Sequence, residues 1–139
     1  MKSLNYAKTI LVSDEGLVLL LRRSQNNHRR PGDWDLAGGE VNPGEELLVG
    51  ATREIKEETG ISVAPEKLRL VYAGTTEYPD SNITVNRLLF VAHVTEKDVV
   101  LSQYEHDDYK WVTVEQALKD FPHPFYSVGL EYAVKHSLL

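Results

Sequence analysis

The alternation of apolar and polar positions divides the first third of the chain into strand-like runs and one polar loop. Ala7 to Ser13 and Leu17 to Arg23 are apolar and rich in branched side chains, and Asp14-Glu15-Gly16 separates them. This arrangement predicts a β-hairpin. The next stretch, Ser24 to Asp33, is polar and ends in a proline and a glycine, which predicts an exposed loop. A short strand is expected from Trp34 to Ala37, directly before two glycines.

A helix is predicted from Glu46 to Thr59. Pro43 is typical of a helix start, and Gly60 suits the position just after a helix end. Within the helix the apolar positions recur at helical spacing, which predicts that one side packs against a core. These inward positions are Leu48, Ala51 and Ile55.

The remaining chain predicts three strands. Arg69 to Tyr78 and Ile83 to Thr95 are long apolar stretches, and the turn-forming residues Pro79 to Asn82 separate them. Tyr109 to Val112 is a further strand candidate.

Two helices are expected after the last strand. Thr113, followed three residues later by Gln116, predicts the capped start of a short helix that runs to Asp120. A last helix is expected from about Tyr126 to Ser137. We expect Val128, Tyr132 and Leu138 to be its inward positions. Strands on both sides of a central helix, with helices at the end, predict an α/β fold in which one mixed sheet lies between helices.

Composition narrows the class of protein. With 139 residues, the chain is long enough for one domain and too short for two ordinary ones. A formal net charge of −6 argues against binding of extended nucleic acid, which normally needs a basic surplus. The absence of cysteine excludes disulfides and thiolate chemistry. The longest purely apolar run, Leu17 to Leu21, is too short to span a membrane, and no secretory segment is evident, so we expect a soluble cytoplasmic protein.

The central helix carries an unusual group of charges, Arg53, Glu54, Glu57 and Glu58. Because a helix turns about 100° per residue, the three glutamates lie on one face within a turn of each other, where like charges repel. Such a run is by itself most often a solvated helix face. A hard divalent cation offers another explanation, since Mg²⁺ takes oxygen ligands from carboxylates and from substrate phosphates. The cluster therefore predicts metal-assisted chemistry on a phosphate.

A longer pattern surrounds this cluster. It consists of glycine, five residues, glutamate, seven residues, and then Arg-Glu-apolar-any-Glu-Glu-any-Gly-apolar. The nine positions are Gly39, Glu45, Arg53, Glu54, Ile55, Glu57, Glu58, Gly60 and Ile61. Together they resemble the Nudix box of the Nudix hydrolases, the MutT-like pyrophosphohydrolases. The resemblance implies a Nudix-type α/β/α sandwich with a mixed β-sheet, formed by residues 1–139 as a single domain.

The resemblance also implies roles for the box residues. Glu54, Glu57 and Glu58 match the positions that hold Mg²⁺ or Mn²⁺ in the family. Arg53 is suited to hold one of these carboxylates, because its guanidinium pairs with carboxylates through two hydrogen bonds. Glu45 is too far back along the helix to bind the same ion and is expected to orient other groups.

Several residues outside the helix are further candidates. Gly38 and Gly39 are expected to let the backbone approach phosphate or metal closely, and a backbone oxygen there is a candidate metal ligand. Glu105 lies before a late strand, where similar proteins supply one more acid, and is expected to be a fourth metal ligand or the general base. The spacing of the five histidines does not match a zinc motif. Whether Glu54, Glu57 or Glu105 takes the proton from water stays open.

Substrate-binding candidates lie before and after the box. Arg22 and Arg23 flank the polar loop that also carries Arg29 and Arg30, and cations there are suited to bind phosphates. Tyr78, seventeen positions after the box, resembles a marker of the dinucleoside polyphosphate hydrolases, although a strand tyrosine is equally suited to packing.

The function implied is a Mg²⁺-dependent pyrophosphohydrolase of a nucleoside diphosphate linked to another group. A MutT-like nucleoside triphosphate pyrophosphatase, which releases a nucleoside monophosphate and pyrophosphate, fits the short chain best. The alternatives are a dinucleoside polyphosphate or ADP-ribose hydrolase and, in another class, a nucleotide-binding Nudix module without turnover. The expected partner is a small nucleotide, and a homodimer is compatible with the resemblance because family members are often dimers.

Overall fold

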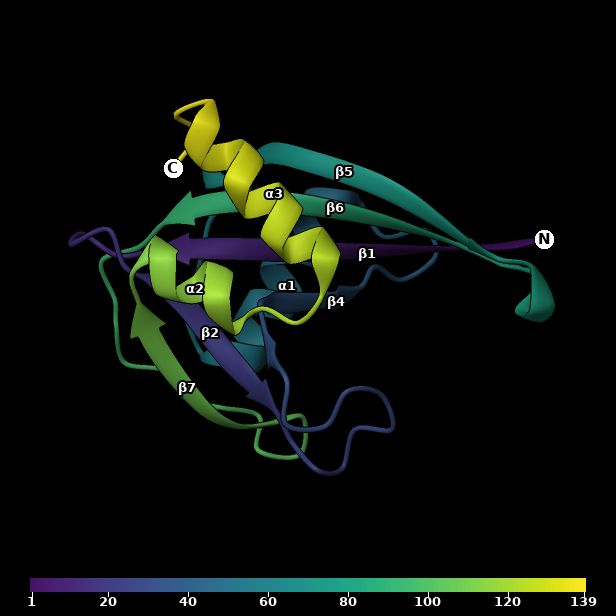
Figure 1. Ribbon diagram of the computed structural model, residues 1–139, viewed down its shortest axis with the longest axis horizontal. Helices are drawn as coiled ribbons and strands as arrows, with labels where there is room; N and C mark the ends of the chain where they lie inside the picture. The colour runs from purple at the N-terminus through teal and green to yellow at the C-terminus, as the bar shows by residue number, and fades with distance from the viewer.

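A strongly twisted mixed sheet forms the centre of the computed structural model, which describes residues 1–139 (Figure 1). The seven strands are β1 (Lys2–Val12), β2 (Val18–Arg23), β3 (Trp34–Asp35), β4 (Ala37–Glu40), β5 (Arg69–Tyr78), β6 (Ile83–His93) and β7 (His106–Val112). The helices are α1 (Leu47–Thr59), α2 (Val114–Asp120) and α3 (Pro124–Lys135), with 3₁₀ turns at Pro65–Lys67 and Pro79–Ser81. None of the helices is long and apolar enough to cross a membrane.

β1 organises the sheet because it pairs with three other strands. It runs parallel to β6 from Lys2 opposite Ile83 to Val12 opposite His93. On its other edge it pairs antiparallel with β4, and it meets β2 only at Val12 opposite Val18. β5 then pairs with β6, and β7 with β2, both antiparallel. The expected hairpin of β1 and β2 therefore opens immediately after its turn, which leaves room for β4.

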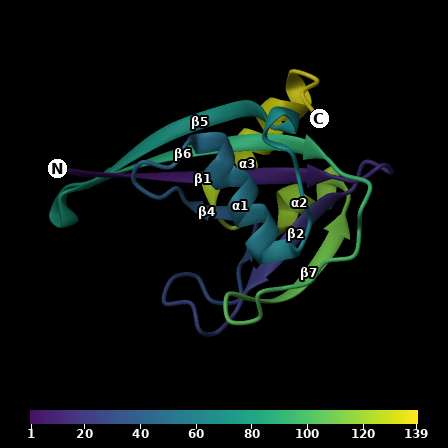
Figure 2. The same cartoon turned by 180° about the vertical axis from the view of Figure 1, so that it is seen from behind.

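The helices cover opposite faces of the sheet. α2 and α3 lie over the face seen in Figure 1, and α1 lies behind it, as Figure 2 shows from the other side. Side chains of a strand alternate between faces. Accordingly, Ile10 and Val12 pack with the residues of α2 and α3, whereas Leu11 packs in a cluster that contains Ile55 of α1. This arrangement confirms the α/β/α sandwich with a mixed sheet.

α1 matches the predicted helix closely. Its N-cap is Glu46, whose carboxylate accepts a hydrogen bond from the Val49 amide at 3.0 Å. Gly60 ends it with a φ of 76°, a left-handed conformation that glycine adopts without strain. The predicted inward positions Ala51 and Ile55 are fully buried. These local signals are sufficient to predict the helix, because its N-cap, its buried apolar positions and its terminal glycine all lie within one segment.

Two strands begin earlier than the sequence predicts. β1 begins at Lys2 rather than Ala7, and β7 begins at His106 rather than Tyr109. Most of the added residues are polar, and they form strand because partners lie beside them, Ile83 opposite Lys2 and Arg23 opposite His106.

The inward face of α3 was wrong in the prediction. Val128 and Tyr132 are 46% and 41% exposed. The buried residues of α3 are Tyr126, Gly129, Leu130 and Ala133. A Cβ added at Gly129 would overlap the side chain of Leu89, so the helix approaches the sheet most closely at a glycine. A glycine has no hydrophobic side chain, and the apolar pattern therefore did not reveal this face. Leu138 is half-buried against the same core, as expected.

Candidate active site

Gly38, the second residue of β4, is paired with Lys8 of β1 and contacts α1 through Glu58. Its φ of 142° and its contact with β1 both require glycine, because an added Cβ would overlap the carbonyl oxygen of Ala7. The Gly38 amide donates a hydrogen bond of 2.6 Å to Oε1 of Glu58. At Gly39, an added Cβ would lie 2.9 Å from the carboxyl carbon of Glu54. The two glycines thus bring the backbone into contact with two glutamates of α1.

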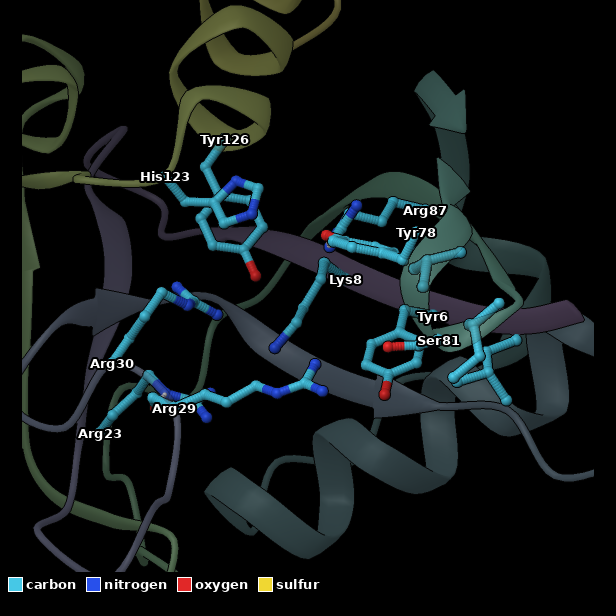
Figure 3. Close-up of a pocket in the computed structure, with 13 residues that line it drawn as sticks. Tyr6, Lys8, Arg23, Arg29, Arg30, Tyr78, Ser81, Arg87, His123 and Tyr126 are labelled. Atoms are coloured by element: carbon cyan, nitrogen blue, oxygen red, sulfur yellow. Dashed lines mark hydrogen bonds between the residues drawn. The ribbon is translucent and has the colours of Figure 1, made fainter. Parts of the chain in front are cut away.

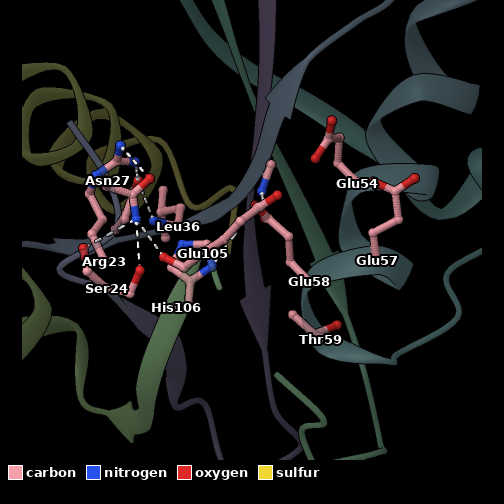
Figure 4. Close-up of polar contacts among 12 residues, drawn as sticks. Arg23, Ser24, Asn27, Leu36, Glu54, Glu57, Glu58, Thr59, Glu105 and His106 are labelled. Atoms are coloured by element: carbon pink, nitrogen blue, oxygen red, sulfur yellow. Dashed lines mark hydrogen bonds and ion pairs between the residues drawn. The ribbon is translucent and has the colours of Figure 1, made fainter. Parts of the chain in front are cut away.

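Figure 4 shows the three glutamates of α1, and their side chains differ in burial. Glu58 is 3% exposed, and its burial raises the pKa of its carboxyl well above the ordinary value, although Lys8 and the Gly38 amide oppose this shift. Partial burial also raises the pKa of Glu54, against the opposing charge of Arg53. Glu57 lies exposed at the surface. Two of the three carboxylates are therefore desolvated, and a bound cation would stabilise their charged forms.

Arg53 holds the glutamates of the helix in place. Its Nε and Nη2 donate to the two carboxylate oxygens of Glu45 at 2.7 and 2.9 Å. Its Nη1 lies 3.2 Å from oxygens of both Glu54 and Glu57. The hydrogen bonds from Arg53 lower the pKa of Glu45 to about 2. The pairing of Arg53 with Glu57 is an i,i+4 pair, but the guanidinium also joins two further carboxylates.

Glu105 approaches these carboxylates from the opposite side. The carbonyl of Glu105 accepts hydrogen bonds from the Ser24 amide at 2.9 Å and from the Asn27 side chain at 2.6 Å, so the polar loop holds this segment in place (Figure 4). Ligand atoms of Glu58, Glu105 and His106 lie within 4.8 Å of one another. Oxygen donors from two elements suit a hard divalent cation. Of the four predicted carboxylate ligands, Glu58 and Glu105 belong to this group, whereas Glu54 and Glu57 do not.

His106 is a member of this cluster that the sequence did not single out as a ligand. It is 3% exposed, and neither ring nitrogen has a hydrogen-bond partner. Burial lowers the pKa of its imidazole to about 4, so the ring is neutral at pH 7. The only signal in the sequence is its position directly after Glu105.

A cavity of about 690 Å³ lies on the α3 side of the sheet (Figure 3). Its walls contain no carboxylate, although the chain as a whole is acidic. Five cationic side chains line it, together with Tyr6, Tyr78, His123 and Tyr126; the cations are Lys8, Arg23, Arg29, Arg30 and Arg87. A pocket of this charge is suited to the phosphates of a nucleotide.

The two arginines predicted to bind substrate have different places. Arg23 lines the cavity, and so does Tyr78. Arg22 lies outside it, where its Nε pairs with Asp107 at 2.7 Å and its guanidinium lies 6.0 Å from the ring centre of Trp34. The register of β2 against β7 shifts between Arg22 and Arg23, and such an irregularity changes the direction of the side chains at that point of the strand.

A buried charge network supports the floor of the cavity, and the sequence analysis missed it. The Lys8 ammonium binds the Asp35 carboxylate at 3.3 Å, and Arg23 binds the same oxygen at 2.9 Å. Burial alone would raise the pKa of Asp35, but the charges of Lys8 and Arg30 and the hydrogen bonds from Tyr126 and Arg23 together hold the pKa well below its usual value. A signal was available, since Lys8 is the only charged residue in the mainly apolar run from Ala7 to Val12.

Lys8 also connects the cavity to the carboxylates. Its ammonium donates to the carbonyl of Gly38 at 3.0 Å, and the amide of the same residue binds Glu58. The cationic cavity and the acidic cluster therefore meet at Gly38. A cavity suited to phosphates beside carboxylates suited to a cation is compatible with a substrate that carries a metal ion on its phosphates.

Comparisons with known proteins agree with this geometry. Residues 5–129 match the family model described as NUDIX domain. A nucleoside triphosphatase NudI of Klebsiella pneumoniae (strain 342) is 33% identical over 123 residues, which cover 80% of this chain and 82% of that protein. A nucleoside triphosphatase NudI of Salmonella arizonae is 30% identical, with 92% and 89% covered.

Solved structures show the same fold. The MutT protein of Methanosarcina mazei Go1 matches with a TM-score of 0.84 and 32% identity, and the match covers 98% of this chain and 96% of that one. An Ap4A hydrolase of C. elegans matches with a TM-score of 0.73 and 26% identity, with 97% and 98% covered. On the evidence of the matched domain, the fold and the box from Gly39 to Ile61, the chain belongs to the Nudix hydrolase family.

Proposed function

We propose that the protein is a Mg²⁺-dependent nucleoside triphosphate pyrophosphohydrolase that converts a nucleoside triphosphate and water into a nucleoside monophosphate and pyrophosphate. The observation that carries the proposal is the contact of an acidic cluster with a cationic cavity at Gly38. Two relatives that match at least 80% of the chain are named nucleoside triphosphatases, which supports this substrate class. Nudix proteins generally use a divalent metal, which fits the carboxylates of the site.

The acidic cluster is proposed to hold Mg²⁺, or Mn²⁺ in its place. Glu54, Glu57, Glu58 and Glu105 are the carboxylate ligands, and Gly39 is the candidate for a backbone oxygen ligand. When bound, the ion neutralises charge on the bridging phosphates and makes the attacking water more acidic. Arg53 keeps Glu54 and Glu57 in position through its hydrogen bonds to them.

The remaining steps fall to side chains of the same two regions. Arg23, Arg29 and Lys8 are proposed to bind phosphate oxygens, because they line the cavity that Gly38 joins to the acidic cluster. A carboxylate takes the proton of the attacking water. Glu54, Glu57 and Glu105 are the candidates, since an oxygen of Glu58 already accepts the Gly38 amide.

A panel of substrates tests the proposal. Purified protein is incubated with Mg²⁺ and each nucleoside triphosphate, with diadenosine tetraphosphate and ADP-ribose as further members, and the products are identified by ³¹P nuclear magnetic resonance. We expect pyrophosphate, not orthophosphate, from at least one triphosphate. Glu57→Gln should lower kcat at least about tenfold, as loss of metal-site groups commonly does. Glu131→Gln, which changes an exposed glutamate of α3, is the matched control.

Three outcomes would contradict the proposal. Equal activity of wild type and Glu57→Gln on every compound would remove the acidic cluster from the reaction. Orthophosphate as the product would place the attack at another phosphorus. Nucleotide binding without any product would favour a non-catalytic module.

A second candidate is hydrolysis of a dinucleoside polyphosphate. Tyr78 lines the cavity beside Arg87, whose Nη2 lies 3.3 Å from the tyrosine hydroxyl, and a similar structure is an Ap4A hydrolase. The same panel decides between the two. Faster turnover of diadenosine tetraphosphate than of any triphosphate would favour the second candidate.

A further inference from the structure

His106 is a buried polar side chain without a partner, and no role described above requires a histidine there. Leaving a buried polar group without a hydrogen bond costs about 1 to 3 kcal/mol, so native structures rarely contain one without a reason. Both ring nitrogens of His106 are in this condition, and its side chain is only 4% exposed. The backbone is well held, since the His106 amide donates to the carbonyl of Ser102 at 2.9 Å. The ring is therefore held in place with nothing bound to its nitrogens.

The ring faces two carboxylates. Nδ1 of His106 lies 4.0 Å from Oε2 of Glu58, which is longer than a hydrogen bond. The other oxygen of Glu58 already accepts the Gly38 amide, so Oε2 is the one that remains. An oxygen of Glu105 completes a triangle whose ligand atoms are all within 4.8 Å of one another.

These separations suit three ligands of one metal ion. With bond lengths of about 2.0 to 2.2 Å, two ligands of an ion lie about 2.8 to 3.6 Å apart at octahedral or tetrahedral angles. A side of the triangle at the limit of 4.8 Å would therefore need to shorten by about 1 to 2 Å. Glu105 is exposed and can supply much of this movement by rotation of its side chain.

We propose that His106 is a nitrogen ligand which, with Glu58 and Glu105, forms a site selective for a first-row transition metal such as Mn²⁺ over Mg²⁺. The proposal deepens the proposed function, because it takes two of the carboxylates of that metal site as its other ligands.

The chemistry of imidazole gives the selectivity. Mg²⁺ prefers oxygen ligands in a near-octahedral shell and keeps several waters. A neutral imidazole binds transition metals more readily, because they accept nitrogen donors. A site of two carboxylates and one imidazole therefore favours Mn²⁺, Co²⁺ or Zn²⁺, whereas a site of carboxylates alone favours Mg²⁺.

Pulsed electron paramagnetic resonance of bound Mn²⁺ tests for the nitrogen directly. The full-length protein with less than one equivalent of Mn²⁺ should show electron spin echo modulation from ¹⁴N, and protein labelled with ¹⁵N-histidine should show the ¹⁵N pattern instead. The modulation should disappear in His106→Gln. It should persist in His93→Gln, which changes an exposed histidine at the end of β6.

Metal affinity gives a second measurement. Titration calorimetry should show that His106→Gln weakens Mn²⁺ binding at least about tenfold, as expected for a lost metal-site group. Mg²⁺ binding should change by less than about threefold, because Mg²⁺ makes little use of nitrogen. Equal weakening of both ions would overturn the proposal and would instead assign His106 a hydrogen bond to Glu58.

The isotope experiment on wild type stands even where His106→Gln is poorly folded. Wild type that binds Mn²⁺ without histidine nitrogen modulation overturns the proposal. Hydrolysis of nucleotides with Mg²⁺ in that same sample would leave the proposed function intact. Conversely, histidine modulation in a protein that hydrolyses no nucleotide with either ion would support the metal site and contradict the proposed function.

Discussion

Asp35→Asn is expected to destabilise the protein strongly, because it removes the carboxylate that forms an ion pair with a buried lysine. Asp35 is fully buried, and the side chain of Lys8 is only 7% exposed. Asparagine keeps the shape of the side chain but not its charge. The Lys8 ammonium would then keep only its hydrogen bonds to the carbonyls of Leu36 and Gly38.

The magnitude follows from this geometry. Removing one partner of a buried ion pair typically costs about 3 to 5 kcal/mol, since an uncompensated charge remains in the interior. Arg23 also loses its partner, but its side chain is 17% exposed and reaches solvent. We therefore assign most of the cost to Lys8. Against a typical stability of about 5 to 15 kcal/mol, the loss is large.

Equilibrium unfolding in urea at pH 7 measures this cost in a double-mutant cycle. Wild type, Asp35→Asn, Lys8→Met and the double variant are compared through their free energies of unfolding. The double variant should be more stable than Asp35→Asn, because replacing both members of a buried pair is often close to neutral. The coupling energy should be about 2 kcal/mol.

Two results would refute the reasoning. One is a cost of less than about 1 kcal/mol for Asp35→Asn, which is the size of an ordinary substitution. The other is a coupling energy within about 0.5 kcal/mol of zero, the additivity expected of independent sites.

Three further predictions concern pH and the acidic cluster. The pKa of Asp35 is lower in the folded protein than its unfolded value of about 4, so its contribution to stability is complete above that pH and is lost as the pH falls. Urea unfolding between about pH 5 and 2 should therefore show a decline in the free energy of unfolding that is shallower in Asp35→Asn than in wild type. Gly39→Ala places a Cβ against the flexible carboxylate of Glu54, so the free energy of unfolding should change by less than about 1.5 kcal/mol. The Mg²⁺-dependent kcat should fall, and an unchanged kcat would contradict this role of Gly39. Lysine in Arg53→Lys cannot reproduce the paired hydrogen bonds to Glu45, so calorimetry should show that Mg²⁺ binding is weakened about tenfold. The same Mg²⁺ affinity in the variant and in wild type would show that Arg53 does not position the site.

The central helix and its acids could be predicted from sequence because their determinants are local. Spacing along a helix decides that Glu54, Glu57 and Glu58 share a side, and Gly60 ends the helix through its own backbone conformation. The structure preserves these relations. The error in α3 has the opposite cause. Its packing face depends on how closely Gly129 approaches Leu89 of the sheet, and this contact between distant residues has no hydropathy signal in the helix.

Other parts of the candidate site depend on contacts between distant segments. Lys8 and Asp35 are 27 residues apart, and neither position reveals the other. Arg22 and Arg23 are neighbours in β2, yet one pairs with Asp107 and the other lines the cavity, because the register of the strand shifts between them. His106 becomes part of the acidic cluster only because β7 pairs with β2 and lies opposite α1.

The sequence alone thus determined the family, the helix with its carboxylates and the type of bond that the site is built to cleave, because helix geometry relates residues three and four apart without reference to the rest of the chain. The tertiary structure decided the cationic cavity, the buried pair of Lys8 and Asp35, and the approach of His106 to Glu58. All three features depend on strand register and on side-chain direction. A shift of a single residue in register would turn the side chains of the affected strand to the other face of the sheet.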